Sequence, residues 1–131
     1  MQYAARAGSA AARYFGGGDR LLPRYAWFLA SGSERAWPVG RLKPNDLGLF
    51  DVLGNAAEWV ADPPYLYDPA RPRDDDERRA RPEKNDEDRV HRGAQFNTPS
   101  VPNLRSAYRV GDRPVSRDVF HGFRVARTLP D

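Results

Sequence analysis

Apolar and polar residues alternate with a period of two in three stretches of the second half of the chain. The stretches cover residues 89–96, 103–110 and 123–127. Such alternation is typical of β-strands whose two faces meet different surroundings. Each stretch therefore predicts a strand, and His91 falls on the face that we expect to point to solvent.

The first half of the chain follows a different pattern. Residues 2–7 predict a short helix, with Gly8 in a suitable position for its C-terminal cap. Residues 13–60 mix short apolar pieces with glycine, proline and asparagine, and show no sustained helical period. We therefore expect irregular structure there, with core anchors at Tyr14, Phe15, Tyr25, Trp27, Phe28, Trp37, Leu49 and Phe50.

A charge-dense stretch at residues 68–89 lies between these two halves. Its sequence, DPARPRDDDERRARPEKNDEDR, offers no aromatic or aliphatic anchor. It cannot bury enough apolar surface to offset the entropy lost on ordering. We predict a solvated, mobile loop inside a single domain that spans residues 1–131.

Composition narrows the possible functions. The chain of 131 residues contains no cysteine, which excludes disulfides, thiolate metal sites and thiol nucleophiles. Its net charge is +3, but acidic and basic residues are interspersed, so we do not expect nucleic-acid binding. The absence of cysteine fits a cytoplasmic protein. No run of about 18 apolar residues occurs, so we expect no membrane span.

The other residues that could take part in catalysis or ligand binding form no strong motif. The sequence GGGD at residues 16–19 lacks the Lys-Ser/Thr pair of a phosphate-binding loop. The chain has two histidines, His91 on a predicted strand and His121 on a turn before Gly122. We interpret each as a surface or capping residue and assign neither of them a metal.

Five motifs occur in a fixed order: MQYAARAG, AWPVGRLKPNDLGLFDVLGNAAEWVAD, RVHRGAQFN, NLRSAYRV and HGFRVARTLP. Together they resemble the second half of the formylglycine-generating enzyme, or sulfatase-modifying factor, domain family. The resemblance implies an α+β fold of the C-type lectin type, largely irregular with small antiparallel sheets. Family members carry a substantial portion before the YAARAG motif, so it also implies an N-terminally truncated domain. Missing strands would expose sheet edges, which predicts self-association or a covering partner.

The resemblance implies a calcium site in DVLGNAAEWV, residues 51–60. The implied ligands are the side chains of Asp51 and Glu58 and the backbone carbonyls of Gly54 and Ala56, with Asn55 ordering the turn. Calcium prefers six to eight such hard oxygen ligands at about 2.3–2.6 Å. The alternative is a hydrogen-bonded turn in which Glu58 pairs with an arginine.

The resemblance also indicates which chemistry is lost. Catalytic family members oxidise a substrate cysteine with two active-site cysteines and bound copper, but these positions fall near Thr98 and Asn103 here. A family serine is replaced by Gln95, and a family tryptophan by Ala57. Copper(I) needs soft sulfur ligands, so we expect neither copper nor formylglycine generation.

The leading interpretation is a non-catalytic domain of this family that acts as a binding or scaffolding module. Its expected partner is a protein or small-molecule ligand, a second copy, or a fused or neighbouring kinase, as in bacterial relatives. One alternative is a family oxidoreductase that works with a fuller paralogue. Another is a diversified ligand-binding protein of a diversity-generating retroelement, with variation near residues 96–120.

The arginines of the predicted strands have two interpretations. The first is pairing with Asp46, Asp51, Glu58 or backbone carbonyls in semi-buried networks. The second is recognition of an anionic ligand at the lectin-like surface. The residues concerned are Arg92, Arg105, Arg109 and Arg124.

Overall fold

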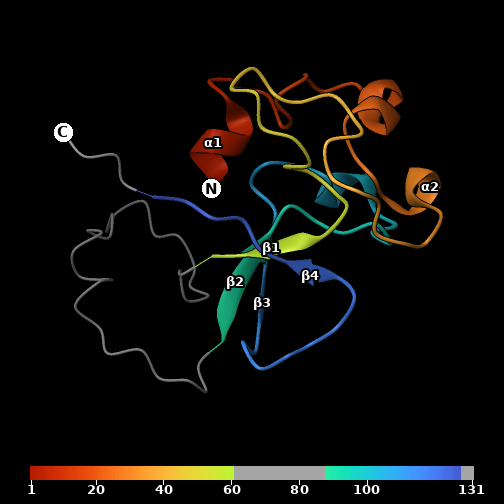
Figure 1. Ribbon diagram of the computed structural model, residues 1–131. Helices are drawn as coiled ribbons and strands as arrows, with labels where there is room; N and C mark the ends of the chain where they lie inside the picture. The colour runs from red at the N-terminus through yellow and green to blue at the C-terminus, as the bar shows by residue number, and fades with distance from the viewer. Residues whose placement is uncertain (61–87, 128–131) are drawn as a thin grey trace.

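Short helices and strands joined by long irregular segments form the molecule (Figure 1). The computed structural model describes residues 1–60 and 88–127. The helical elements in that part are α1 (Gln2–Arg6), η1 (Asp19–Arg24), α2 (Leu29–Gly32) and η2 (Val101–Asn103). The strands are β1 (Ala57–Trp59), β2 (Arg89–Arg92), β3 (Arg109–Asp112) and β4 (His121–Gly122).

The four strands form one small mixed sheet in the order β3-β2-β1-β4. Strand β2 pairs antiparallel with both β1 and β3, whereas β1 and β4 run parallel. A small mixed sheet with few helices agrees with the expected irregular α+β class. The parallel β1–β4 pair was not expected from the sequence. In Figure 1 the irregular N-terminal half lies on one side of this sheet.

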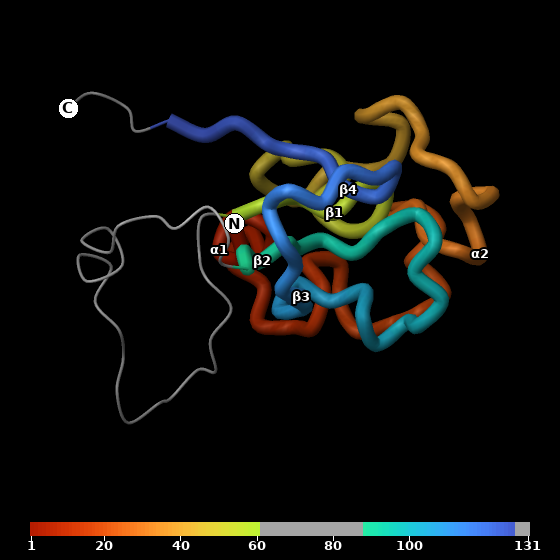
Figure 2. Tube along the Cα trace, turned by 90° about the horizontal axis from the view of Figure 1, so that it is seen from below, coloured from red at the N-terminus to blue at the C-terminus, as the bar shows by residue number. Residues whose placement is uncertain are grey.

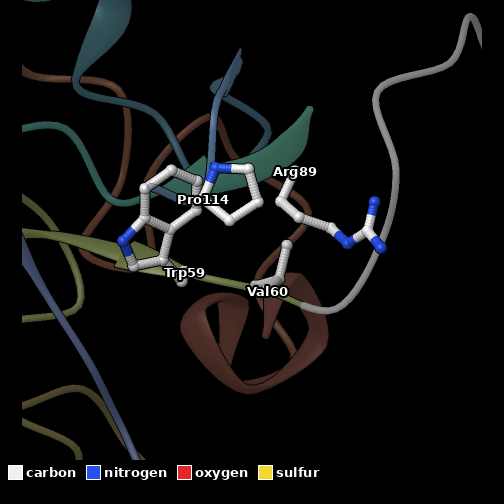
Figure 3. Close-up of a pocket in the computed structure, with 4 residues that line it drawn as sticks. All are labelled: Trp59, Val60, Arg89 and Pro114. Carbon is white, nitrogen blue, oxygen red and sulfur yellow. The ribbon is translucent and has the colours of Figure 1, made fainter. Parts of the chain in front are cut away.

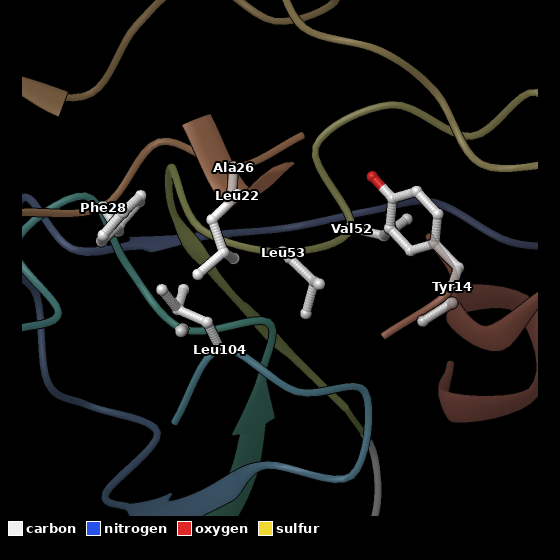
Figure 4. Close-up of a cluster of buried hydrophobic side chains, with 9 residues drawn as sticks. Tyr14, Leu22, Ala26, Phe28, Val52, Leu53 and Leu104 are labelled. Carbon is white, nitrogen blue, oxygen red and sulfur yellow. The ribbon is translucent and has the colours of Figure 1, made fainter. Parts of the chain in front are cut away.

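Leucine side chains from distant parts of the chain meet in the core. Leu22, Leu53 and Leu104 are each at most 1% exposed, and in Figure 4 they point toward one another. Complete burial of such a side chain stabilises the folded state by about 1.5–3 kcal/mol. Beside them, the stacked rings of Phe15 and Tyr25 lie 4.3 Å apart. The core thus joins η1, the loop before β1 and the segment after η2.

The predicted N-terminal helix is present, but its cap differs. Helix α1 covers Gln2–Arg6, and Ala7 takes the left-handed conformation at its end with φ 48°. Gly8 follows with φ 85°. The left-handed turn begins one residue before the glycine, so the expected cap at Gly8 was displaced by one position.

Burial after η2 alternates as predicted, although the backbone there is not a strand. Leu104 and Ser106 are buried, and Arg105 is exposed. The Ser106 N–H donates to the carbonyl of Ala12 at 3.0 Å, and a strand begins only at Arg109. The alternation of buried and exposed residues here therefore reflects contact with the N-terminal loop rather than a continuous ladder of β-sheet hydrogen bonds.

The predicted strand at residues 123–127 is wrong. Strand β4 ends at Gly122, and the chain then leaves the sheet along the outside of the molecule (Figure 2). Phe123 and Val125 are each 83% exposed. Strand β4 pairs with β1 only through His121 and Gly122, and the ladder ends there.

The other expectations about the fold have mixed outcomes. Tyr14 and Phe28 are buried anchors as expected, but Phe50 is 39% exposed. The predicted mobile loop at residues 68–89 lies outside the described residues, except for Asp88 and Arg89. Within the described residues, no helix has the length and apolar character needed to cross a membrane.

Candidate functional site

The loop before β1 is a tight turn locked onto the N-terminal half. Asp51, Gly54 and Asn55 have φ values of 53°, 75° and 65°. The Asn55 side chain accepts from the Trp37 N–H at 2.8 Å and donates to the Trp37 carbonyl at 3.1 Å. Its own N–H donates to the Trp27 carbonyl at 2.8 Å. Asn55 therefore orders the turn, as the sequence suggested.

Three of the four residues implied as calcium ligands line one pocket. Asp51, Ala56 and Glu58 face a cavity of about 540 Å³. Both carboxylates are buried, with Asp51 8% and Glu58 7% exposed. Asp51 Oδ2 accepts a hydrogen bond from the Gly40 N–H at 2.7 Å. Gly54 is packed underneath the loop against Trp27.

Glu58 already has a strong partner in Arg124. The guanidinium Nε lies 2.8 Å from Oε2 and Nη2 lies 2.6 Å from Oε1, a bidentate pair. The same Nη2 donates to the Phe50 carbonyl at 2.8 Å. Hydrogen bonding to Glu58 raises the pKa of Arg124. The predicted alternative, in which an arginine pairs with Glu58, is thus present in the structure.

Polar and apolar side chains both line the pocket. The Glu58–Arg124 pair and Asp51 belong to its lining. Val39 and Phe123 belong to its lining and are 80% and 83% exposed. A concave site with few polar groups and apolar walls is the usual form of a ligand-binding pocket.

The segment expected to hold family cysteines is a hydrogen-bonded turn. Thr98 is 7% exposed, and its hydroxyl oxygen accepts from the Gln95 N–H at 3.0 Å. The Asn103 N–H donates to the Ser100 carbonyl at 3.0 Å. Both residues thus take part in local backbone turns, and neither side chain supplies sulfur.

The expectation that His91 faces solvent is wrong. His91 is 4% exposed, and the side chain of His121 is 8% exposed within β4 rather than on a turn. Their ring centroids lie 4.6 Å apart, and the Trp59 ring lies 4.8 Å from that of His121. Burial, followed by the charge of His121, lowers the pKa of His91. The pairing of β4 with β1 brings the rings together, and no local pattern in the sequence signals it.

Comparisons with known proteins identify a family and several similar structures for this chain. A family model described as the sulfatase-modifying factor enzyme 1-like domain matches residues 1–129. Treponema denticola variable protein 1 is similar in structure with a TM-score of 0.77 and 25% identity over 93% of this chain and 42% of that one. PvdO from Pseudomonas aeruginosa is similar with a TM-score of 0.75 and 30% identity over 93% of this chain and 47% of that one. CarF is similar with a TM-score of 0.67 and 21% identity over 98% of this chain and 44% of that one, which is a likeness of fold alone.

Two further results limit what these comparisons say about the chain. The chain spans less than half the length of each of these three solved structures. A search of curated proteins finds no match. The similar structures confirm the α+β fold of the C-type lectin type that the motifs implied.

Proposed function

Because the chain belongs to the sulfatase-modifying factor enzyme 1-like domain family, we propose that it is a non-catalytic binding or scaffolding domain of that family. One observation carries the proposal. The turn that would present the reactive pair of cysteines instead presents Thr98 and Asn103, and Thr98 is engaged in a hydrogen bond with the backbone. A threonine hydroxyl is neither a thiolate nucleophile nor a soft ligand for copper(I).

Absence of oxidase chemistry is directly testable. Incubation of the purified chain with a CxPxR peptide, copper and oxygen should leave the mass of the peptide unchanged, because the chain has no cysteine thiolate to hold copper. Mass spectrometry of the peptide measures the outcome, and a cysteine-bearing family enzyme serves as the positive control. Conversion of the peptide cysteine to formylglycine by this chain would refute the non-catalytic assignment.

The pocket above Glu58 is the surface best suited to a ligand. Its Arg124 offers a cation, although both Nε and Nη2 are engaged by Glu58. The exposed lining residues Val39 and Phe123 offer apolar contact. A small molecule or a protein segment that inserts an apolar group is the ligand that this lining supports. The exposed apolar residues also support association with a second copy or another protein.

Calcium is part of the proposal as a structural ion. Asp51 and Glu58 bring two buried carboxylates to one pocket. Arg124 pairs with Glu58, and among the described residues no basic side chain forms an ion pair with Asp51. This excess negative charge fits a divalent cation, held by the carboxylates of Asp51 and Glu58 and by the carbonyls of Gly54 and Ala56. The ion would cross-link the turn to β1.

Addition of calcium is therefore expected to raise the melting temperature. Binding to the folded state alone stabilises it by about 2.7 kcal/mol at a free concentration 100 times Kd. Differential scanning fluorimetry with calcium or chelator measures the shift. Glu58→Gln should abolish the shift, even though the loss of its pair with Arg124 also lowers the starting temperature. Asp46→Asn, at an exposed position, should retain it.

Two results would contradict the calcium proposal. One is a melting temperature that responds to neither calcium nor chelator. The other is an equal shift in Glu58→Gln and in the unsubstituted chain, which would locate the ion elsewhere.

Similarity to a variable protein favours a second candidate, a diversified ligand-binding protein. Diversification needs positions that can change without loss of the core. Within residues 96–120, Arg113, Val115, Arg117 and Val119 are exposed, which suits that requirement. A nearly identical template repeat beside the gene would support this candidate, and its absence would favour the first.

A further inference from the structure

Both histidines of the chain lie together beside Asp112. One possible ligand atom from each of His91, Asp112 and His121 lies within 4.8 Å of the others. The two imidazole centroids are 4.6 Å apart and the rings are inclined at 69°. Residues 91 and 121 are thirty positions apart in the sequence, so the sheet alone creates this cluster.

The strand register explains why the three side chains converge. Trp59 pairs with His91, and Ala57 pairs with His121. Asp112 pairs with the β2 residue two positions before His91. Since alternate residues of a strand point to the same face, all of these side chains lie on one face of the sheet. Ala57 leaves the space between the two rings free of a large side chain.

Three of the four imidazole nitrogens are buried without a hydrogen-bond partner. Among the described residues these are Nδ1 of His91 and both Nδ1 and Nε2 of His121. His91 as a whole is 4% exposed, and the His121 side chain is 8% exposed. Buried polar groups in native proteins are almost always satisfied, so an unpaired group at such a position needs an explanation such as an ion.

A neighbouring carboxylate orients one of the rings. Oδ1 of Asp118 lies 2.9 Å from Nδ1 of His121, although the contact is not aligned as a hydrogen bond. A hydrogen bond from one ring nitrogen of a histidine to a carboxylate usually supports metal ligation through the other nitrogen. In the proposed complex Asp118 would accept from Nδ1 of His121, and Nε2 would bind the ion.

We propose that His91, Asp112 and His121 bind a divalent transition-metal ion, with zinc as its representative. Two imidazole nitrogens and one carboxylate oxygen suit zinc, which such sites hold at about 2.0–2.2 Å. The chain has no cysteine, so nitrogen and oxygen donors decide the choice of metal. Burial lowers the pKa of His91, and metals bind the neutral form of imidazole.

Three protein ligands leave one position of a tetrahedral site open, as in catalytic rather than closed structural zinc sites. A separate pocket of about 290 Å³ is lined by Trp59, Val60, Arg89 and Pro114, and none of the three proposed ligands belongs to its lining. In Figure 3 the Pro114 ring lies beside the Trp59 indole, and the Arg89 guanidinium extends away from it.

The alternative explanation is an aromatic packing cluster without a metal. Trp59 lies edge-on to His91 with centroids 5.7 Å apart, and it is tilted against His121 at 4.8 Å. In this explanation the local turn accounts for Asp112, because its Oδ1 accepts hydrogen bonds from the Arg113 N–H at 2.7 Å and from the Ser116 hydroxyl at 3.3 Å. Measurement of zinc binding separates the two explanations.

The test is a titration of the full chain, without a polyhistidine tag, with Zn²⁺. Isothermal titration calorimetry gives stoichiometry and affinity, and NMR follows the imidazole signals. Because the chain has two histidines, the spectrum of His121→Gln assigns both rings. We expect one ion per chain and simultaneous shifts of both sets of imidazole signals.

Variants then identify the ligands. Asp112→Asn and His121→Gln should each weaken Zn²⁺ binding at least about 100-fold, and Asp118→Asn by about 10–100-fold, because outer-shell partners contribute that much. Asp88→Asn is the matched control, since Asp88 is exposed and outside the cluster. It should bind like the unsubstituted chain.

Clear results would overturn the proposal. Absence of Zn²⁺ binding at millimolar concentration would do so, as would shifts confined to one imidazole or to neither. Unchanged affinity in a folded Asp112→Asn chain would also refute it and leave the packing cluster as the explanation. The NMR titration uses the unsubstituted chain, so it decides the question even where a variant fails to fold.

Discussion

Replacement of Gly54 by alanine is expected to cost about 3–5 kcal/mol of folding stability, the largest effect among the described glycines. A Cβ at this position would lie 2.1 Å from the Trp27 carbonyl oxygen and 2.9 Å from its carbon. Gly54 also has φ 75°, which side chains rarely adopt. All three of the nearest atoms belong to the backbone of Trp27, which cannot move away as cheaply as the end of a side chain.

The structure provides a matched control for the part of the stability loss that comes from the positive φ angle alone. Gly48 also has φ 75°, but a Cβ added there would meet nothing within 4 Å. Gly48→Ala should therefore lose only the conformational part, about 1 kcal/mol. Chemical denaturation measured by circular dichroism gives both values. Equal losses in the two variants would show that the close approach of Gly54 to Trp27 is not important.

Substitution of Arg13 by alanine is expected to destabilise the fold by about 2–4 kcal/mol, since a buried charged donor would be lost and its acceptors left unpaired. Arg13 is 5% exposed. Its Nε donates to the Leu104 carbonyl at 2.7 Å, Nη1 to Gly17 at 3.2 Å, and Nη2 to Val101 at 3.3 Å. One guanidinium thus fastens the N-terminal loop to the segment around η2.

The ion pair of Arg13 contributes little to that loss. Asp19 lies 2.9 Å from Nη1, but its side chain is 66% exposed, and exposed pairs stabilise proteins by about 0–1 kcal/mol. Asp19→Asn should therefore be nearly neutral. Arg24→Ala, at an exposed position, controls for the loss of one positive charge. A loss in Asp19→Asn as large as that in Arg13→Ala would contradict the role of the carbonyl bonds. Thermal and chemical denaturation of the three variants measure the differences.

The two most constraining residues of the fold thus differ in how visible they are in the sequence. Gly54 stands in a Gly-Asn pair, which already suggests a left-handed turn. Nothing near Arg13 indicates that it is buried, because two of its three carbonyl acceptors lie about ninety residues away. Long-range backbone contacts of this kind have no local signature.

The candidate site also contains some residues that the sequence indicated and others that only the tertiary structure revealed. The sequence supplied Asp51, Ala56 and Glu58, which line one pocket, and it offered an arginine as partner for Glu58. It predicted Arg124 to lie within a strand, whereas Arg124 follows the end of β4 and reaches back to Glu58. His91 was placed on the wrong face because both faces of β2 are covered, so alternation did not separate inside from outside.

The sequence by itself determined the family, the class of fold, the short first helix, the turn at Gly54 and Asn55, and the absence of cysteine chemistry. These follow from motif order, local backbone preferences and composition, which act over a few residues. Only the tertiary structure decided that β4 runs parallel to β1, that Arg13 joins distant loops, and that His91 and His121 meet beside Asp112. Each of these depends on the pairing of segments far apart in the chain, and that pairing is set by the packing of the whole core.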